Sequence, residues 1–311
     1  TEGKAARHHD RRTVPEGADA IIMHERTSFT ENTVTLTAPV TSAKHHSTWE
    51  DVAAGTLLVP KGKILTASDL ALIAGQGLLK LGSIKSSPSA YQYRSELLNT
   101  GSPLEYGKIY NTNPYLLGGY IQKHHMTANY LNTVSDDLDS LCRAVLEALK
   151  TNDVVITTGG VSAGDFDYMP EVIRRIGGDL LFHRLKFKPG GAMLGAFKDG
   201  KVILGLSGNP GAAATGLLCV GFPFMRKLSG RSDITFSQTT AYLGVDFKKS
   251  SPVTRILKGH SDFKNGMLYF TPLSNQHNGS VSSMSDCDLL AVIPAGSKPL
   301  AAGDKLEVYI L

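Results

Sequence analysis

The chain has 311 residues, of which 41% are hydrophobic and 19% charged, a composition typical of a globular protein too long for a single core. No apolar run approaches the length of a membrane span and no secretory signal is evident, so we expect no membrane partner. The net charge of +4 suits small anionic ligands, and because no basic tract is interleaved with aromatic residues we expect no nucleic acid partner.

The first 48 residues predict a partial small β domain. They are rich in Thr, Val and Glu, and short alternating apolar runs occupy 20–23 and 33–37. Alternation of this kind is typical of strands that bury one face. We therefore expect residues 1–48 to form short strands rather than helices.

Residues 49–82 predict a linking segment that contains one strand and one helix. A short apolar run at 57–59 predicts the strand. Thr66 and Asp69 are three residues apart and form a capping box, which predicts the start of the helix, and Gly75 marks its end.

The remaining residues predict two further domains. Residues 83–230 alternate strand and helix patterns, including an amphipathic helix over 136–149, and so predict a parallel sheet with right-handed crossovers. Residues 231–311 hold short alternating strands broken by Gly, Asn and Pro. We expect an α/β fold, in which a three-layer domain with a parallel sheet is flanked by a small N-terminal β domain and a C-terminal β-barrel or sandwich.

The most informative segment is a glycine-rich loop at 157–170. The apolar run at 153–156 predicts a buried strand before it, and 171–176 predicts a helix after it. Such a loop leaves backbone N–H groups free at a helix N-terminus, where they can hold an anion. Asp165 and Asp167 add carboxylates that can hold a metal cation beside a phosphorylated ligand. A plain turn between strand and helix is the alternative.

A second loop of this kind follows a strand predicted at 201–206. It reads SGNPG over 207–211 and opens an Ala-rich helix. Ser207 or Asn209 can cap this helix, and Pro210 suits its first turn. The two loops therefore predict two places where an anion can be held.

Residues 182–188, between the two loops, predict a strand with a cationic face. Strict alternation places Arg184, Lys186 and Lys188 on the same face, and the run ends in Pro-Gly-Gly at 189–191. A cationic face near two anion-holding loops predicts a site for a polyanionic small molecule. A solvated strand face is the alternative.

The histidines and cysteines predict neither a zinc site nor a disulfide framework. Adjacent side chains diverge on a strand or helix, so the three His-His pairs are poor chelators, and no Cys/His spacing fits a zinc motif. The three cysteines are scattered and odd in number, at Cys142, Cys219 and Cys287. This usage favours a reducing, cytoplasmic location.

The chain resembles the molybdopterin molybdenumtransferase family, the bacterial MoeA and gephyrin E-domain group. The resemblance lies in TTGGVSAGDFDYMPEVI at 157–173, FKPGG at 187–191 and GLSGNPGAAATG at 205–216. The family's PEGADA strand and C-terminal β domain have counterparts at 15–20 and 290–308. These motifs occur in the family's order and cover nearly the whole chain, so together they are highly specific.

The resemblance implies a role in molybdenum cofactor biosynthesis. The α/β domain is expected to bind molybdopterin, and the protein to insert molybdate into adenylylated molybdopterin with Mg2+, releasing AMP. A homodimer and other cofactor-biosynthesis proteins are the expected partners, and residues 49–82 would be a remnant of the dimerisation domain. Two other functions stay open: a non-catalytic molybdopterin-binding carrier or scaffold, and a nicotinamide-nucleotide amidohydrolase of the CinA type, against which the extra β domains argue.

The resemblance also implies roles for individual residues. The expected metal ligands are Asp165, Asp167 and Glu96. The expected catalytic residues are Glu96, Asp136, Lys188 and Asp51. The expected cofactor-binding residues are Gly159, Gly160, Ser162, Gly164, Asp165, Asp167, Arg184, Lys188, Pro189, Gly190, Ser207, Gly208, Asn209, Pro210, Ser282 and Ser283.

The chain departs from the family pattern at several places, among them 45–49, which lacks the usual Arg/Lys-Gly. The N-terminal SAMDGYA motif does not occur, so we expect an N-terminally truncated or a divergent member. The STGDEL motif reads QYRSEL at 92–97, IYDSN has Asn111 in place of its acid, and KPGK ends in Gly191. Loss of a carboxylate removes negative charge from a metal site, and changes around metal ligands weaken binding by about 10–100-fold.

Overall fold

The structure, a computed structural model, describes only part of the chain. The described residues are 22, 24–37, 52–53, 55–78, 88–92, 97–98, 103, 106, 109–130, 134, 137–161 and 167–311, with backbone alone at 88–92 and 97–98. The chain divides into two compact units, residues 1–59 and 60–311. In the described part of the chain, every helix is too short or too polar to cross a bilayer.

The first unit contains a β-hairpin. A 3-10 helix at His24–Arg26 leads into β1 (Thr27–Phe29), which pairs antiparallel with β2 (Val34–Leu36). The alternating run at 33–37 therefore forms a strand as predicted. The run at 20–23 lies mostly outside the described residues.

Helix α1 (Ala67–Gly75) begins at the predicted capping box. Thr66 Oγ1 accepts a hydrogen bond from Asp69 N at 3.2 Å, and Asp69 Oδ2 accepts one from Thr66 N at 2.9 Å. The strand predicted at 57–59 is wrong, because no described strand pairs with these residues and the Leu57 side chain is 75% exposed.

A six-stranded sheet with the strand order β6-β3-β7-β11-β10-β8 forms the centre of the second unit. Its strands are β3 (Pro88–Gln92), β6 (Asn129–Tyr130), β7 (Val154–Thr158), β8 (Asp179–His183), β10 (Leu194–Lys198) and β11 (Lys201–Leu206). The predicted parallel arrangement is confirmed for β6, β3, β7 and β11, whereas β10 and β8 add an antiparallel edge. The turn at Asp199 and Gly200 explains this edge, since a two-residue hairpin joins antiparallel strands only.

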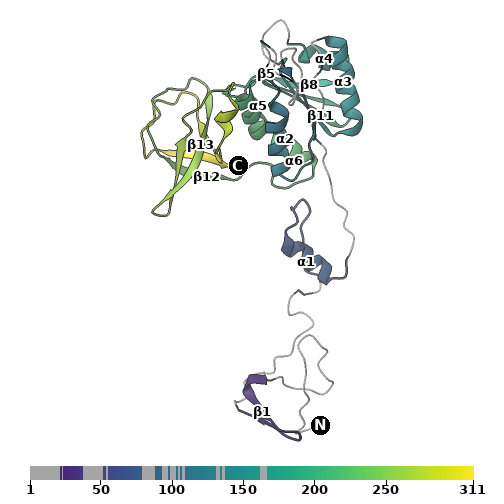
Figure 1. Ribbon diagram of the computed structural model, residues 1–311, viewed down its shortest axis with the longest axis vertical. Helices are drawn as coiled ribbons and strands as arrows, with labels where there is room; N and C mark the ends of the chain where they lie inside the picture. Colours follow the sequence, from purple (N-terminus) through teal and green to yellow (C-terminus); the bar gives the residue numbers. More distant parts are fainter. Residues whose placement is uncertain are drawn as a thin grey trace. The chain divides into compact units, whose positions relative to one another are not determined.

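Helices cover both faces of this sheet, which confirms the three-layer domain (Figure 1). They are α2 (Asn113–Lys123), α3 (Leu138–Thr151), α4 (Met169–Arg175), α5 (Pro210–Gly216) and α6 (Phe222–Leu228), with a π-helical turn at Leu217–Gly221. Val155 packs with residues of α3 and α4, whereas Val154 and Ile156 pack with residues of α2 and α5. The alternation within β7 therefore separates two cores. A short parallel pair, β4 (Leu97–Leu98) and β5 (Ile109–Tyr110), precedes α2.

Helix α3 begins two residues later than the predicted 136–149. Asp137 has extended backbone angles, and its side chain accepts a hydrogen bond from Ser140 N at 2.8 Å. Asp137 is therefore the N-cap, and the helix continues to Thr151 because its apolar face packs against β7.

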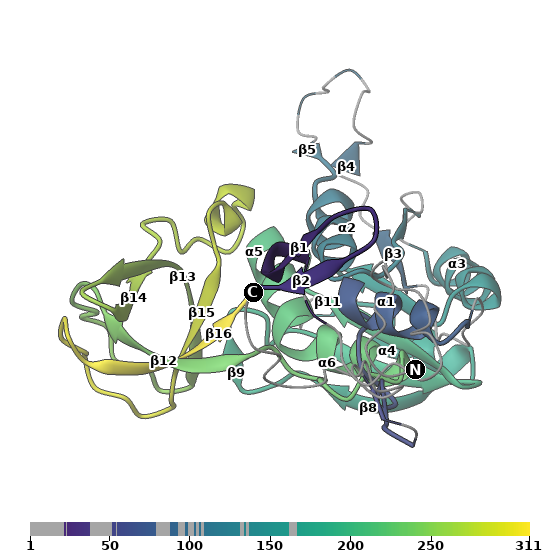
Figure 2. The same ribbon diagram turned by 90° about the horizontal axis from the view of Figure 1, so that it is seen from below.

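The C-terminal strands close into the predicted barrel, which lies beside α5 (Figure 2). They are β12 (Gln238–Leu243), β13 (Thr254–Lys264), β14 (Met267–Pro272), β15 (Leu289–Ile293) and β16 (Lys305–Ile310), with a 3-10 helix at Val281–Met284. The order β14-β12-β16-β15-β13 closes because β13 also pairs with β14. Leu257 faces the barrel core, whereas Ile256 packs in the α/β core on the other side of β13.

The continuous strand predicted at 182–188 is wrong. β8 ends at His183, Arg184 takes a left-handed conformation with φ +65°, and β9 (Phe187–Lys188) pairs with β13 of the barrel. The alternation breaks because the chain passes from one sheet to the other within this segment. Backbone hydrogen bonds from Arg184 N to Met193 O and from Leu185 N to Gly191 O, both 2.8 Å, hold the resulting loop.

Candidate functional site

A cavity of about 500 Å3, here called the loop cavity, lies where the α/β domain meets the barrel. Its wall is formed mainly by the loop 184–192. Ser207 and Asn209 from the loop after β11, and Val253 and Asn278 from the barrel, complete it. The structure therefore brings the predicted cationic segment and the predicted SGNPG loop to one place.

The loop 184–192 is compact because two glycines occupy places where no side chain fits. A Cβ on Gly191 would lie 2.2 Å from Phe187 O and 2.4 Å from Leu185 O. A Cβ on Gly190, where φ is +98°, would lie 2.8 Å from Gly216 N in α5. The cation that the family pattern places at position 191 therefore has no room in this loop conformation.

The SGNPG loop is anchored to helix α2. Asn113 Nδ2 donates a hydrogen bond to Gly208 O at 2.9 Å, and Asn209 N donates one to Ser207 Oγ at 3.2 Å. Asn209 is the N-cap residue of α5 as expected, but its side chain makes no capping hydrogen bond. Both Ser207 and Asn209 line the loop cavity.

Lys258 is a candidate site residue that the sequence reasoning missed. Its side chain is fully buried, and Nζ has no hydrogen-bond partner among the described residues. A Cβ on Gly211 in α5 would lie 3.1 Å from Lys258 Nζ and 2.6 Å from Ser283 Oγ, so the three residues meet behind the cavity wall. Burial lowers the pKa of Lys258.

The sequence did hold one signal for Lys258. It lies two residues after Ile256 in β13, so period-two alternation places it on the face that packs against the α/β core. A lysine on such a face needs a partner, because an unpaired buried charge is costly. An anion between the two domains would supply that partner.

The two predicted serines of the barrel have different surroundings. Ser283 is buried against Gly211, and its Oγ donates a hydrogen bond to Ser280 O at 2.7 Å. Ser282 is exposed, and its Oγ contacts Ser280 Oγ at 2.8 Å and Asn275 Nδ2 at 3.0 Å. The structure therefore brings Ser283 to α5 and engages Ser282 within its own loop.

The glycine-rich loop starts next to the SGNPG loop. Gly159 N donates a hydrogen bond to Leu206 O at 2.9 Å, and Met169 N donates one to Gly160 O at 3.2 Å. Both glycines have positive φ, +95° and +66°, which favours glycine at these turns. Asp167 is described and lies two residues before α4. The other predicted residues here and elsewhere lie outside the described part of the chain: Ser162, Gly164, Asp165, Glu96, Asp136 and Asp51.

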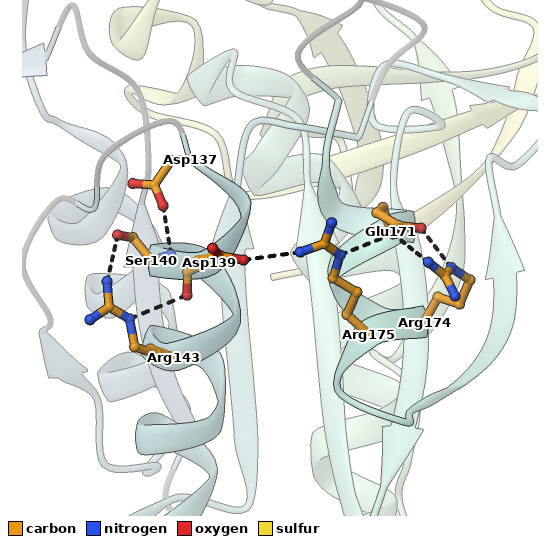
Figure 3. A network of polar contacts seen from close by, with 7 residues as sticks. All are labelled: Asp137, Asp139, Ser140, Arg143, Glu171, Arg174 and Arg175. Atoms are coloured by element: carbon orange, nitrogen blue, oxygen red, sulfur yellow. Dashed lines mark hydrogen bonds and ion pairs between the residues drawn. The ribbon is translucent and has the colours of Figure 1, made fainter.

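A network of ion pairs joins the first turn of α3 to α4 (Figure 3). Arg175 contacts Asp139 at 3.0 Å and Glu171 at 3.1 Å, and Arg174 contacts Glu171 at 2.6 Å. The hydrogen bond from Arg174 lowers the pKa of Glu171 to about 2.

The loop cavity is electropositive. Arg184, Lys186 and Lys188 line it, no carboxylate occurs among its described lining residues, and Lys258 lies behind the wall. Such a set binds oxyanions through charge-assisted hydrogen bonds. No group of three or more His, Cys, Asp or Glu in the described part of the chain could hold a metal ion. The predicted metal site at Asp165, Asp167 and Glu96 therefore stays a prediction.

Three family profiles match the chain in order. They are the MoeA N-terminal region (domain I and II) at 11–77, a probable molybdopterin binding domain at 96–227 and the MoeA C-terminal region (domain IV) at 240–311. The crystal structure of the molybdopterin biosynthesis MoeA protein from Pyrococcus horikoshii has the same fold. It superposes with a TM-score of 0.76 at 24% identity, over 96% of this chain and 73% of that chain. A molybdenum cofactor biosynthesis protein from Pyrococcus furiosus superposes with a TM-score of 0.62 at 20% identity, over 84% and 82%.

Curated relatives extend the likeness from fold to sequence. The molybdopterin molybdenumtransferase of Staphylococcus aureus strain MRSA252 is 32% identical over 299 residues, which are 96% of this chain and 71% of that protein. The enzyme of Staphylococcus epidermidis is 31% identical over the same shares. With the three profiles in the same order, these relatives place the chain in molybdenum cofactor biosynthesis. The chain belongs to the molybdopterin molybdenumtransferase family.

Proposed function

We propose that the chain inserts molybdate into adenylylated molybdopterin and releases AMP. The observation that carries this proposal is the fully buried, unpaired Lys258 ammonium behind an electropositive cavity. Molybdate is a tetrahedral dianion, and a cationic group binds such an oxyanion through charge-assisted hydrogen bonds.

The described residues divide into two groups by the part of the substrates they would hold. Arg184, Lys186 and Lys188 line the open cavity, where they would bind the phosphates of the adenylylated pterin. Lys258 lies against Gly211, where its ammonium would bind molybdate next to those phosphates. Ions and substrate would then be held in fixed positions, which lowers the entropic cost of bringing them together.

Mg2+ belongs to the proposal through three carboxylates, Asp165, Asp167 and Glu96. Carboxylate oxygens are ligands that Mg2+ prefers, and a bound Mg2+ would neutralise phosphate charge as the phosphate bond is cleaved. Arg184, Lys186 and Lys188 would hold the phosphate oxygens of the same ligand. We also propose that the protein is a homodimer that works with other cofactor-biosynthesis proteins. We propose a cytoplasmic location as well, because its three cysteines are free thiols, which a reducing compartment favours.

The test is calorimetric titration with adenylylated molybdopterin, with and without Mg2+, followed by measurement of AMP release when molybdate is added. Release of AMP supports the proposal. Tight binding of the pterin without release would contradict it and would favour a carrier or scaffold.

A Lys258→Met variant makes the test specific to the proposed anion site. We expect AMP release to depend on much higher molybdate concentrations, whereas folding stability should not fall, because replacing an unpaired buried charge with an apolar chain is often neutral or stabilising. Lys264→Met is the matched control, since Lys264 is in the same strand with an exposed side chain. Equal molybdate dependence in the two variants would contradict the role of Lys258.

A further inference from the structure

A second cavity of about 500 Å3, here called the α6 cavity, shares no lining residue with the loop cavity. It lies between the C-terminal end of α2, helix α6, the segment 232–238 that leads into β12, and the end of β16. Residues of both the α/β domain and the barrel therefore face it. The site described above does not use any of them.

Arg226 supplies the α6 cavity with a buried charge. The residue is only 5% exposed, and its guanidinium lies over the Phe236 ring with 4.3 Å between Cζ and the ring centroid. Nη1 donates a hydrogen bond to Thr235 O at 2.6 Å, whereas Nε has no partner among the described residues. In the described part of the chain no carboxylate lies within ion-pair distance of Arg226. The guanidinium therefore keeps donors and charge that the protein does not satisfy.

His124 shows that the surroundings of the cavity are electropositive. Its ring packs edge-on against Phe222 at 4.7 Å and Phe236 at 5.0 Å between centroids, and Nε2 has no partner among the described residues. Burial and then the charges of nearby basic groups lower the pKa of His124 to about 4. Those basic groups are Arg226, Lys123, Arg231 and His125.

The carboxylate on the cavity wall, Asp233, acts on Arg226 through its charge but makes its ion pair with another residue. Asp233 is paired with Arg231, which donates from Nε to Asp233 Oδ1 at 2.9 Å and from Nη2 to Oδ2. Among the charged side chains of the lining that the structure describes, Arg226 is thus the one without an ion pair. Ser237 and Gln238 line the same cavity and add neutral hydrogen-bond donors, whereas the Ser232 hydroxyl donates to Gly62 O at 3.3 Å.

We propose that the α6 cavity binds a small oxyanion, held by the Arg226 guanidinium and the hydroxyl of Ser237. Phosphate, sulfate and carboxylate each present two or more oxygen atoms at the spacing that a guanidinium can bind with paired hydrogen bonds. The alternative is that Arg226 only holds the segment 232–238 in place. That role needs the hydrogen bond to Thr235 O but does not account for the unpaired Nε beside the cavity. This proposal does not depend on the reaction at the loop cavity.

Binding here would couple the two domains. The oxyanion would contact α6 of the α/β domain and the segment that enters β12 of the barrel. A ligand that binds only the folded protein raises its melting temperature as the ligand concentration rises. The oxyanion would also add negative charge beside His124, which favours the protonated ring.

The test uses NMR spectroscopy of the whole wild-type chain. Two signals are followed: that of the Arg226 Nε–Hε group and that of the His124 ring. The chain is titrated with inorganic phosphate, sulfate and acetate in turn, with ionic strength held constant by chloride. We expect saturable shifts of both signals with at least one of these anions, and a His124 pKa that rises with its concentration. The anion that saturates at the lowest concentration identifies the ligand class. Shifts that match chloride alone for all three anions would overturn the proposal.

Two variants separate this cavity from the loop cavity. Lys188→Ala should leave the Arg226 and His124 shifts unchanged, because Lys188 lines the other cavity. Arg226→Lys assigns the Arg226 signal and should weaken the anion-dependent His124 shift by about tenfold, since the paired donors of the guanidinium are lost. If Arg226→Lys does not fold, Ser237→Ala should weaken the same shift by several-fold. A full His124 response in the folded variant would refute the assignment.

Discussion

Arg184 combines a strained backbone conformation with a side chain placed for ligand binding. Two substitutions can measure these two effects separately. The Arg184 φ of +65° is left-handed, a conformation that costs an L side chain roughly 1–2 kcal/mol and glycine almost nothing. Its side chain lines the loop cavity. Glycine at this position removes both the strain and the guanidinium, whereas alanine removes the guanidinium alone.

The two variants should differ in stability and agree in binding. At an ordinary position with negative φ, glycine is less stable than alanine by roughly 0.5–1 kcal/mol. At position 184 we expect the opposite order, with Arg184→Gly more stable than Arg184→Ala by about 1 kcal/mol. Both should weaken binding of adenylylated molybdopterin by about 1.5–3 kcal/mol, the worth of a hydrogen bond to a charged group.

Urea unfolding of the ligand-free variants measures the first difference, and calorimetric titration measures the second. An alanine variant at least as stable as the glycine variant would show that position 184 is not left-handed in solution. Affinities within error of the parent in both variants would refute a contact between Arg184 and the ligand.

Three further predictions concern the loops and the network of Figure 3. Gly191→Ala should destabilise the fold by about 1–3 kcal/mol, because its Cβ would lie 2.2 Å from a backbone oxygen; an unchanged urea midpoint would contradict this. Asp165→Asn and Asp167→Asn should weaken Mg2+-dependent ligand binding with little loss of stability. An unaltered Mg2+ dependence in both variants would refute the predicted metal site. The pKa of Glu171 falls from 4.5 to about 2, so its carboxylate stabilises the fold above pH 4.5 and this contribution is lost as the pH falls toward 2. Glu171→Gln should remove that part of the acid dependence of the unfolding midpoint, and an identical pH profile would count against it.

The two strand-loop-helix units were predictable from the sequence because their signals are local. Buried β7 follows from an uninterrupted apolar run, and α5 follows from a proline at its first turn. The positive φ angles of Gly159 and Gly160 are ones that glycine adopts without strain. Each of these features depends on residues a few positions apart, so a sequence pattern contains them.

The features that could not be predicted depend on distant partners. The alternation at 182–188 fits one strand, but β9 pairs with residues 254–255 of the barrel, and this non-local pairing decides the conformation. Lys258 becomes a candidate site residue only because α5 covers its face of β13. The family pattern supplied the expected catalytic carboxylates, and their places in the fold lie outside the described residues.

The pairing of β9 with β13 has a consequence for recombination between relatives. Phe187 and Lys188 pair with Thr254 and Arg255, so the loop that carries the cavity's cations is hydrogen-bonded to a strand of the other domain. Consider a chimaera that takes its α/β domain from one homologue and its barrel from another, joined in the segment before β12. Its strand β9 would then have to pair with a β13 strand from a different protein. Exchange of the barrel between homologues should therefore preserve activity only when residues 187–188 and 254–255 travel together. The unit to be exchanged between homologues is therefore the paired strands β9 and β13 together, rather than either domain alone.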